Sequence, residues 1–205
     1  MARALLELLK KTFAGAVLES WSQHGDETAV IEPSRWHDVA AFLKTSSESD
    51  MSMLTDLTAV DFPDRNPRFE VVAHFYSLSK GHRVRLKARI GDPAGEHVHI
   101  PSLSDLWGSA NWLERECWDM FGVVFVGHPD LRRILLYPEF VGHPLRKDYP
   151  ADRIQPLVEY RDVPAIDKVA PFHHDEGMSF GRQTFDHIGS ADGDDPELFP
   201  GQKAN

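Results

Sequence analysis

Residues 69–90, FEVVAHFYSLSKGHRVRLKARI, carry the clearest structural pattern in this chain. Beyond a turn at 79–81, apolar and basic residues alternate strictly; the apolar positions are Val84, Leu86, Ala88 and Ile90, and the basic positions are Arg83, Arg85, Lys87 and Arg89. A period of two is typical of a β-strand with one buried face and one solvated face. Residues 69–78 are rich in β-branched and aromatic side chains and predict the strand before the turn.

The N-terminal residues predict a helix followed by a hairpin. Residues 1–13 combine leucines with charged residues, which indicates an amphipathic helix and not a signal peptide. Residues 16–22 and 28–32 have the composition of short strands, and the polar turn His24-Gly25-Asp26 separates them.

A second helix and a third strand fill the interval before residue 69. Pro33 suits the first turn of a helix, and apolar residues follow at i, i+3, i+4 and i+7 from Trp36. Residues 53–60 predict a strand, and the two prolines of the loop at 63–67 exclude regular pairing there.

The resulting order is helix, strand, strand, helix, strand, strand, strand. It packs most simply as a two-layer α+β domain with the helices on one face of a largely antiparallel sheet. A third helix follows, for which Ser102 and Asp105 are a plausible capping box. Its apolar stripe comprises Leu103, Leu106, Trp107, Ala110, Leu113 and Cys117.

Three regions are expected. Residues 1–122 form the α+β core domain including the third helix, and residues 123–150 form docking loops in which Gly-His-Pro occurs twice, at 127–129 and 142–144. Residues 151–205 contain 11 acidic residues, 5 basic residues and 5 prolines. Such a segment cannot bury a core of its own, so we expect an extended tail that is flexible in the isolated chain and wraps a partner.

Composition excludes several classes of function. The 32 acidic and 22 basic residues give a net charge of -10, which argues against general binding to nucleic acid. The single cysteine, Cys117, forms no internal disulfide and builds no cluster or zinc site alone, which fits a reducing compartment. No apolar run approaches the length of a membrane span, and no glycine-rich phosphate-binding motif occurs.

The densest group of chemically capable residues lies within 111–150. Each Gly-His-Pro is followed by a leucine and a basic pair, at 131–133 and 145–147, so each turn presents an apolar residue beside two cations. Loops of this kind are suited to docking onto another surface.

Two interpretations of the charged residues in this region remain open. Glu114, Glu116 and Asp119 would allow general acid/base chemistry with His128 or His143. Alternatively, they belong to a structural network in which Arg115 pairs with Asp119 at i, i+4, and the remaining carboxylates are neutralised by Arg132, Arg133 and Arg146. We favour the network, since such pairing is commonplace.

Metal sites and the basic strand face receive simpler interpretations. His97 with His99, or His173 with His174, would need further ligands that the sequence does not place nearby. The basic face at residues 83–89 is expected to be a solvated strand face, with partner contact as the minor option.

The motif between 114 and 150 resembles one family specifically. Its segments are Glu114-Arg115-Glu116, Trp118-Asp119-Met120-Phe121-Gly122, and the two longer runs at 127–135 and 142–150. Together they resemble the C subunit of respiratory complex I, the proton-pumping NADH:quinone oxidoreductase. The resemblance extends upstream through Asp61-Phe62-Pro63 and covers roughly residues 5 to 150.

That resemblance implies a non-catalytic structural subunit of the hydrophilic arm. It implies the D and B subunits of complex I as partners, with the chain packed against the first near the quinone site and the second close by. The location implied is the cytoplasmic face of the bacterial inner membrane. The chain itself would hold no cofactor, while FMN and iron–sulfur clusters reside in partner subunits.

Twelve residues match the family motif and are carried over as an assembly and docking set with no catalytic member: Glu114, Arg115, Glu116, Asp119, His128, Asp130, Arg132, Arg133, His143, Arg146, Lys147 and Asp148. Cys117 stands where a small apolar residue is expected, which indicates a volume adjustment. The alternatives are the equivalent subunit of a membrane-bound nickel–iron hydrogenase, a free-standing hydrolase or lyase, and a free-standing adaptor.

Overall fold

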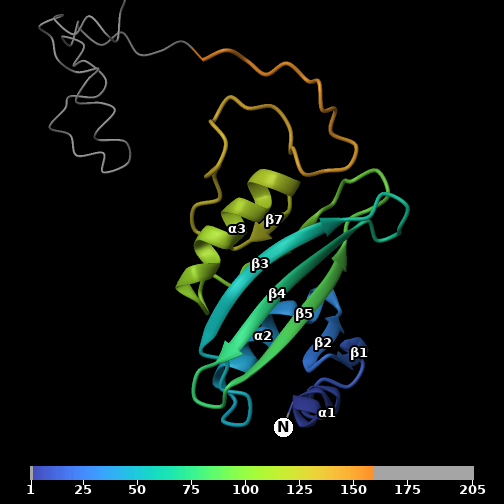
Figure 1. The fold of residues 1–205 in the computed structure, drawn as a ribbon, viewed down its shortest axis with the longest axis vertical. Coiled ribbons are helices and arrows are strands. Elements are labelled where there is room, and N and C mark those ends of the chain that lie inside the picture. The colour runs from blue at the N-terminus through green and yellow to red at the C-terminus, as the bar shows by residue number, and fades with distance from the viewer. Residues whose placement is uncertain (1, 159–205) are drawn as a thin grey trace, which may run out of the picture. The chain divides into compact units, whose positions relative to one another are not determined.

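The structure is a computed structural model that describes residues 2–158. This part of the chain contains three α-helices, one short 3-10 helix and seven strands (Figure 1). The tail predicted at 151–205 falls largely on residues 159–205, which lie outside the described residues, as do His173 and His174.

The N-terminal elements follow the predicted order. They are α1 (Ala2–Thr12), β1 (Val17–Gln23), β2 (Asp26–Ile31), the 3-10 turn η1 (Pro33–Arg35) and α2 (Trp36–Thr45). β1 and β2 pair antiparallel, so the predicted hairpin is confirmed. The apolar stripe of α2 is buried at the four spaced positions Trp36, Val39, Ala40 and Leu43.

The main sheet has five strands in the order β1-β2-β5-β4-β3. Its last three strands are β3 (Met53–Asp61), β4 (Phe69–Ser77) and β5 (His82–Ile90). Neighbouring strands pair antiparallel except β2 and β5, which pair parallel with Ala29 opposite Leu86. The prediction of a largely antiparallel sheet is confirmed.

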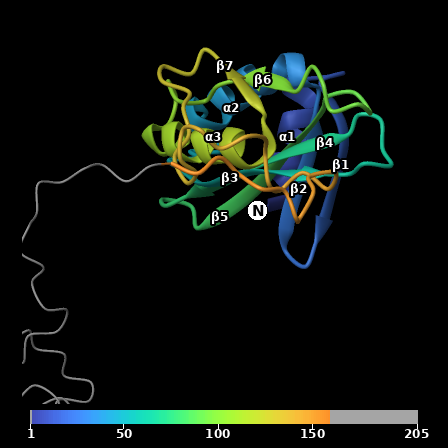
Figure 2. The same ribbon diagram turned by 90° about the horizontal axis from the view of Figure 1, so that it is seen from above.

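One face of this sheet carries all three helices. Val84, Leu86, Ala88 and Ile90 of β5 are buried, and they share one hydrophobic core with Leu9 of α1, Trp36 of α2 and Cys117 of α3 (Gly108–Phe121). Because alternate residues of a strand point to the same side, the three helices lie on the same side of the sheet, as Figure 2 shows. The two-layer α+β class is confirmed.

Two short strands were not predicted. β6 (His99–Pro101) and β7 (Val124–Val126) pair parallel, with Ile100 opposite Phe125. Three residues are too few to show a period in the sequence. Val123 and Phe125 are buried in the core, so contacts with the domain continue past residue 122.

The predicted start of the third helix is wrong. α3 begins at Gly108, and Trp107 is its N-cap, without a side-chain capping bond. The hydroxyl of Ser102 donates instead to Glu114, and Asp105 pairs with His37 at 2.9 Å. Leu103 and Trp107 are nevertheless buried, because the turn before the helix packs on the same core.

Candidate docking surface

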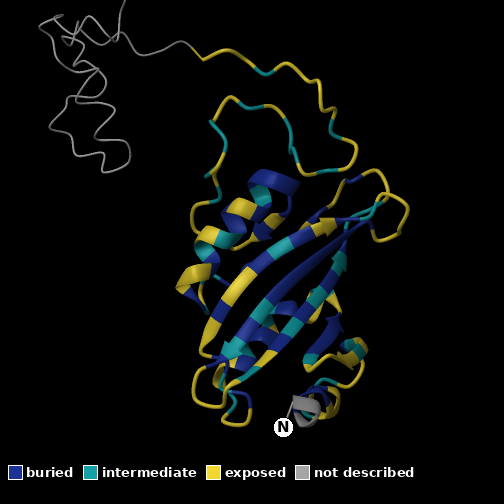
Figure 3. Ribbon diagram, in the orientation of Figure 1, coloured by how far each residue is buried: buried dark blue, intermediate teal, exposed yellow. Residues whose placement is uncertain are grey.

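Residues 127–158, the described residues after β7, lie against the C-terminal end of α3 and contain no further helix or strand. We call residues 127–158 the loop segment; it is drawn in yellow to orange in Figure 1. Figure 3 shows that its residues are half-buried or exposed. Polar side chains therefore have to hold it in place, and ten of the twelve motif residues lie in it or contact it.

Asp119 is the central anchor. Its carboxylate is fully buried and accepts a hydrogen bond from Arg133 at 2.6 Å. The other carboxylate oxygen accepts backbone N–H groups from the loop segment, at 3.1 Å from Ile134 and at 2.9 Å from both Leu135 and Leu136. Burial alone would raise the pKa of Asp119, but these N–H groups and the guanidinium outweigh it and hold the pKa below its ordinary value.

Arg133 extends this anchor into the loop segment. Its Nη2 donates to the carbonyls of Phe140 at 2.7 Å and Gly142 at 3.1 Å. The guanidinium also lies over the rings of Trp118 and Phe140. One arginine thus fixes two stretches of the segment to α3.

The predicted pairing of Arg115 with Asp119 is wrong. Arg115 donates to the backbone carbonyls of Arg132 at 3.2 Å and Arg133 at 3.1 Å, and it lies over the ring of Trp112. It therefore holds the backbone at residues 132–133, and Arg133 is the residue that pairs with Asp119. A buried guanidinium with several carbonyl acceptors suits this role because its donors are fixed in a planar fork.

The first Gly-His-Pro turn is fastened by its histidine. His128 Nε2 lies 3.0 Å from the carbonyl oxygen of Asn111, and its Nδ1 accepts the N–H of Asp130 at 3.0 Å. Asp130 in turn pairs with Arg132 at 2.8 Å on the surface. Both ring nitrogens of His128 therefore lie within hydrogen-bonding distance of backbone groups.

The second Gly-His-Pro turn packs against the end of α3. His143 Nδ1 lies 3.0 Å from the carbonyl oxygen of Asp119, and Leu145 N donates to Met120 O at 3.0 Å. Arg146 donates to the carbonyls of Phe121 at 2.6 Å and Gly95 at 3.2 Å. Burial, together with nearby arginines, lowers the pKa of His143, and burial lowers that of Arg146.

A second buried ion pair ties the segment to the sheet. Asp61 at the end of β3 accepts two hydrogen bonds of 2.7 Å from Arg68, and both side chains are buried. Asp61 also accepts the N–H of Lys147 at 2.8 Å, and Arg68 donates to Asp148 at 3.0 Å. The hydrogen bond from Arg68 lowers the pKa of Asp148.

Asp61 and Arg68 were not predicted as site residues. The period-two pattern of β3 contained a signal, because Leu57 and Ala59 occupy the buried face and Asp61 continues their alternation. A carboxylate at a buried strand position needs a partner, and arginine is the usual one.

Glu114 and Glu116 lie apart from these anchors. Glu114 is fully buried, and its two oxygens accept hydrogen bonds of 2.6 Å from Ser102 Oγ and Leu103 N. It thereby joins α3 to the turn that precedes it. Glu116 is exposed on α3.

Glu114 should make stability depend on pH. Burial raises its pKa from 4.5 to about 7. The folded state then binds this proton more tightly than the unfolded state, so stability falls as pH rises from about 4.5 to about 7. At about 1.4 kcal/mol per pH unit the loss amounts to roughly 3 kcal/mol.

Glu114→Gln should flatten this slope, because the amide can accept one of the two bonds without titrating. Urea unfolding of both proteins across that pH range measures the effect. An equal slope in the variant would show that Glu114 does not titrate there.

The candidate acid/base residues do not converge on a common cleft. Asp119 is enclosed by Arg133 and backbone N–H groups, His128 and His143 are hydrogen-bonded to backbone, and Glu116 is exposed. A groove of about 520 Å³ does exist on the described chain, but it is lined by residues of β2 to β5 such as Asp56, His74 and Arg85. The structural network fits this geometry better than the interpretation as an acid/base enzyme does.

The basic face of β5 is ion-paired. Arg89 makes two hydrogen bonds to Glu19, at 2.7 and 2.8 Å, and Lys87 pairs with Glu70 at 2.7 Å. Side chains of β1 and β4 therefore balance Arg89 and Lys87, while Arg83 and Arg85 each lie 3.7 Å from Asp26 of β2.

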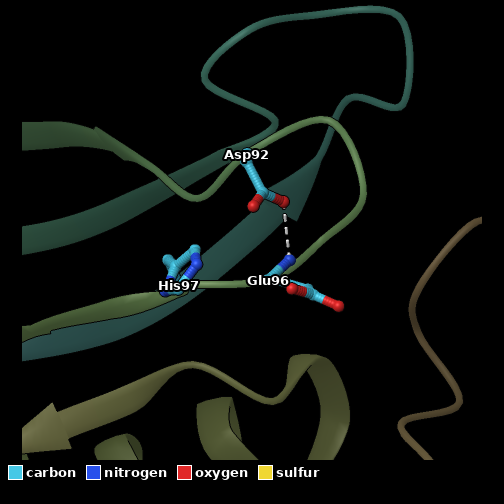
Figure 4. Close-up of side chains that lie close together, drawn as sticks. All are labelled: Asp92, Glu96 and His97. Atoms are coloured by element: carbon cyan, nitrogen blue, oxygen red, sulfur yellow. Dashed lines mark hydrogen bonds between the residues drawn. The ribbon is translucent and has the colours of Figure 1, made fainter.

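One group of three potential metal ligands lies in the loop between β5 and β6. Ligand atoms of Asp92, Glu96 and His97 all lie within 4.8 Å of one another (Figure 4). A hydrogen bond of 2.7 Å from Glu96 N to Asp92 Oδ1 closes the turn and accounts for the approach of two of them. His97 thus has near neighbours, while His99 does not belong to this group.

The remaining part of the loop segment is stabilised by its own side chains. The rings of Phe140 and Tyr149 stack with centroids 6.2 Å apart, and Tyr137 packs edge-on against Phe140. Gln155 Oε1 accepts from Val141 N at 2.9 Å, and its Nε2 donates to Val141 O at 3.2 Å. The segment closes on itself between 137 and 156.

Large apolar side chains of the segment point outward. Leu135 is 62% exposed and Leu145 is 50% exposed, and further along Ile154, Leu157 and Val158 are exposed as well. The two buried ion pairs, Asp119 with Arg133 and Asp61 with Arg68, are more deeply buried than these side chains. Exposed apolar residues held on a fixed frame and rimmed by polar groups are typical of a protein interaction surface.

Solved structures share this fold. The trypsin-resistant fragment (1-134) of Nqo5 matches with a TM-score of 0.53 and 31% identity, covering 62% of this chain and 98% of the fragment. A chain of the membrane-bound sulfane sulfur reductase, an archaeal respiratory membrane complex, matches with a TM-score of 0.62 and 22% identity, covering 80% of this chain and 98% of that one. At that identity the second match shows the fold alone.

Comparison with sequence relatives identifies the family more specifically than the solved structures do. Residues 29–155 match the family described as respiratory-chain NADH dehydrogenase, 30 Kd subunit. The NADH-quinone oxidoreductase C subunit numbered 2 of Rhizobium meliloti (strain 1021) is 41% identical over 150 residues, covering 71% of this chain and 80% of the relative. The C subunit of Ruegeria pomeroyi is 41% identical over 184 residues, covering 84% and 90%.

The chain belongs to the family of the NADH-quinone oxidoreductase C subunit, the 30 kDa subunit of respiratory complex I. The resemblance seen in the motif is therefore confirmed. Between residues 2 and 158, no helix has the length and hydropathy that crossing a membrane requires.

Proposed function

We propose that this chain is a non-catalytic structural subunit of the hydrophilic arm of NADH:quinone oxidoreductase. It supports the D subunit beside the quinone site, with the B subunit close by. Electrons pass from NADH through FMN and iron–sulfur clusters held by other subunits, and this chain holds none of them. The assembled complex keeps it at the cytoplasmic face of the inner membrane.

The loop segment carries this proposal. The buried ion pairs beside it, Asp119 with Arg133 and Asp61 with Arg68, make hydrogen bonds that position the segment. Leu135 and Leu145 are left on the outside of a frame that is fixed before any partner arrives. A surface that is ordered before binding loses less conformational entropy on binding, which favours assembly.

The three predicted regions have separate roles in this proposal. Residues 1–122 supply the rigid core, residues 123–150 present the docking loops, and residues 151–205 act as the acidic tail that wraps the partner. The burial of Phe125 in β7 makes the start of the docking loops continuous with the core.

Affinity capture of the tagged chain from its native membranes tests the proposal. Mass spectrometry of the captured subunits and an NADH:quinone assay are the measurements, and a chain ending at residue 150 tests the tail. The B and D subunits, together with the flavin and cluster-bearing chains and NADH-dependent activity, are expected. A set of hydrogenase subunits, or the chain alone, would overturn the assignment.

A further inference from the structure

The buried carboxyl of Glu114 is connected to the surface by two hydroxyl groups. Its Oε2 lies 2.6 Å from Ser102 Oγ, and Ser102 Oγ lies 2.8 Å from Ser104 Oγ. Glu114 is fully buried, Ser102 is 6% exposed, and Ser104 is half-buried. The three side chains therefore form one hydrogen-bonded chain that leads from the interior toward the solvent.

This chain is complete in either protonation state of Glu114. Ser102 Oγ has one hydrogen to donate and two lone pairs that accept, and Ser104 N donates to one of these at 3.1 Å. When the carboxyl is ionised, Ser102 donates to Glu114 and accepts from the hydroxyl of Ser104. When the carboxyl is protonated, Glu114 donates to Ser102, and Ser102 donates to Ser104. Turning the two hydroxyl groups around therefore keeps every bond.

Other hydrogen bonds hold the turn at 102–107 in both states. The N–H of Leu103 donates to the second carboxyl oxygen of Glu114, Oε1, at 2.6 Å, and Ser102 N donates to Val126 O at 2.9 Å. Neither bond changes its donor when Glu114 titrates, because Oε1 accepts in both forms. The proton can thus move along the chain while the turn stays closed.

The buried carboxyl is poised to titrate. Burial raises the pKa of Glu114 to about 7 against the two hydrogen bonds that it accepts, and the charge of Asp105 raises it further. Both forms of Glu114 are therefore populated near neutral pH, where an exposed glutamate is fully ionised.

Within residues 2–158, the charged and titratable groups on the surrounding elements do not pair with Glu114. His37 of α2 bonds to Asp105, and Lys44 of α2 donates to Leu106 O. Arg115 donates to the backbone carbonyls at 132–133. The others are His128, bonded to backbone, the buried thiol of Cys117, and the exposed Asp56, His99 and Glu116. The titration is therefore that of a single carboxyl.

We propose that Glu114, Ser102 and Ser104 form a proton-binding site with its own path to solvent. On uptake, Ser104 accepts a proton from water and passes its hydroxyl proton to Ser102, which passes its own to Glu114 Oε2. On release the same transfers run in reverse, and neither serine keeps a charge. This site is independent of the proposed function, because no partner subunit takes part.

The test is ¹³C NMR of the full-length chain with labelled glutamate, which follows the side-chain carboxyl of Glu114 from acid to alkaline pH. Glu114→Gln identifies the signal. One averaged line that moves with pH is expected, because the hydroxyl chain exchanges the proton quickly. Separate lines for the two forms would show that the carboxyl is closed off from the solvent and would overturn the proposal.

Two substitutions should move the midpoint of this titration in opposite directions. Ser102→Ala removes a donor to the ionised form, so the midpoint should rise by about one pH unit, the size of one hydrogen bond. Ser104→Ala removes the acceptor that Ser102 needs in the protonated form, so the midpoint should fall. The fall should be about half as large, because a bond between neutral groups is weaker.

Ser109→Ala is the matched control. The hydroxyl of Ser109 donates to Leu54 O at 3.0 Å and takes no part in the chain, so its loss should leave the midpoint unchanged. If the Ser102→Ala chain does not fold, Ser104→Ala decides alone, since Ser104 is only half-buried. An unchanged midpoint in Ser104→Ala, or shifts of the same sign in both variants, would overturn the proposal.

Discussion

Replacement of Asp119 by alanine is expected to lower the free energy of unfolding by about 3–5 kcal/mol. The substitution leaves the guanidinium of Arg133, which is only 13% exposed, without its carboxylate. It also removes the acceptor for three backbone N–H groups at 134–136. Urea unfolding gives the magnitude, and limited proteolysis should cut the variant within 134–142.

Asp130→Ala is the matched control for this experiment. Its pair with Arg132 has a similar length, 2.8 Å, but both side chains are more than half exposed. Exposed pairs contribute about 0–1 kcal/mol, so this variant should behave almost as the unsubstituted protein. Equal losses from the two aspartates would refute the anchoring role of Asp119.

The pH dependence of this anchor has the opposite sign to that of Glu114. Because the pKa of Asp119 is lower in the folded protein, its stabilisation is complete above the ordinary aspartate pKa of 3.8. It is lost as pH falls through the folded value. Acid should therefore release the loop segment, and the Asp119→Ala chain should show less of this acid sensitivity.

Gly122→Ala should cost about 2–5 kcal/mol from two additive causes. Gly122 has φ of 77° at the end of α3, a region that disfavours a Cβ atom. A Cβ there would also lie 2.6 Å from Arg146 Nη2 and from His143 Cδ2. Neither neighbour moves away freely, because His143 bonds to Asp119 O and Arg146 to Phe121 O.

Gly127→Ala separates the two causes. Gly127 has φ of 90°, but a Cβ at this position would meet no atom within 4 Å. Its substitution should cost only the backbone contribution, about 1–2 kcal/mol. The difference between the two variants in urea unfolding then measures the clash, and equal values would show that His143 and Arg146 yield without cost.

Local sequence patterns predicted the helices and strands in which buried residues recur at a regular spacing. The alternation at 84–90 and the helical spacing from Trp36 hold because each face meets one continuous core. The predicted start of α3 failed because the hydroxyl of Ser102 bonds to Glu114, twelve residues later, a contact that no local pattern contains. Strands of three residues, such as β7, are too short to show a period.

The motif predicted which residues gather in the site but not how they pair. The i, i+4 rule places Arg115 beside Asp119 only if both lie on a solvated helix surface. Asp119 is instead covered by the returning loop segment, so Arg133 reaches it first. The anchoring by Asp61 required knowledge of where residue 147 returns, which only the folded chain provides.

The parallel pairing of β2 with β5 has a consequence for the order of folding. β3, β4 and β5 are neighbours along the chain and can form from local turns, whereas Ala29 must find Leu86 across more than fifty residues. Closing so long a loop is slow, because its conformational entropy is lost before any contact between the strands compensates for it. We expect the three-stranded meander to form first and the N-terminal hairpin to dock afterwards, so pulse-labelled amide exchange during refolding should protect β4 before β2.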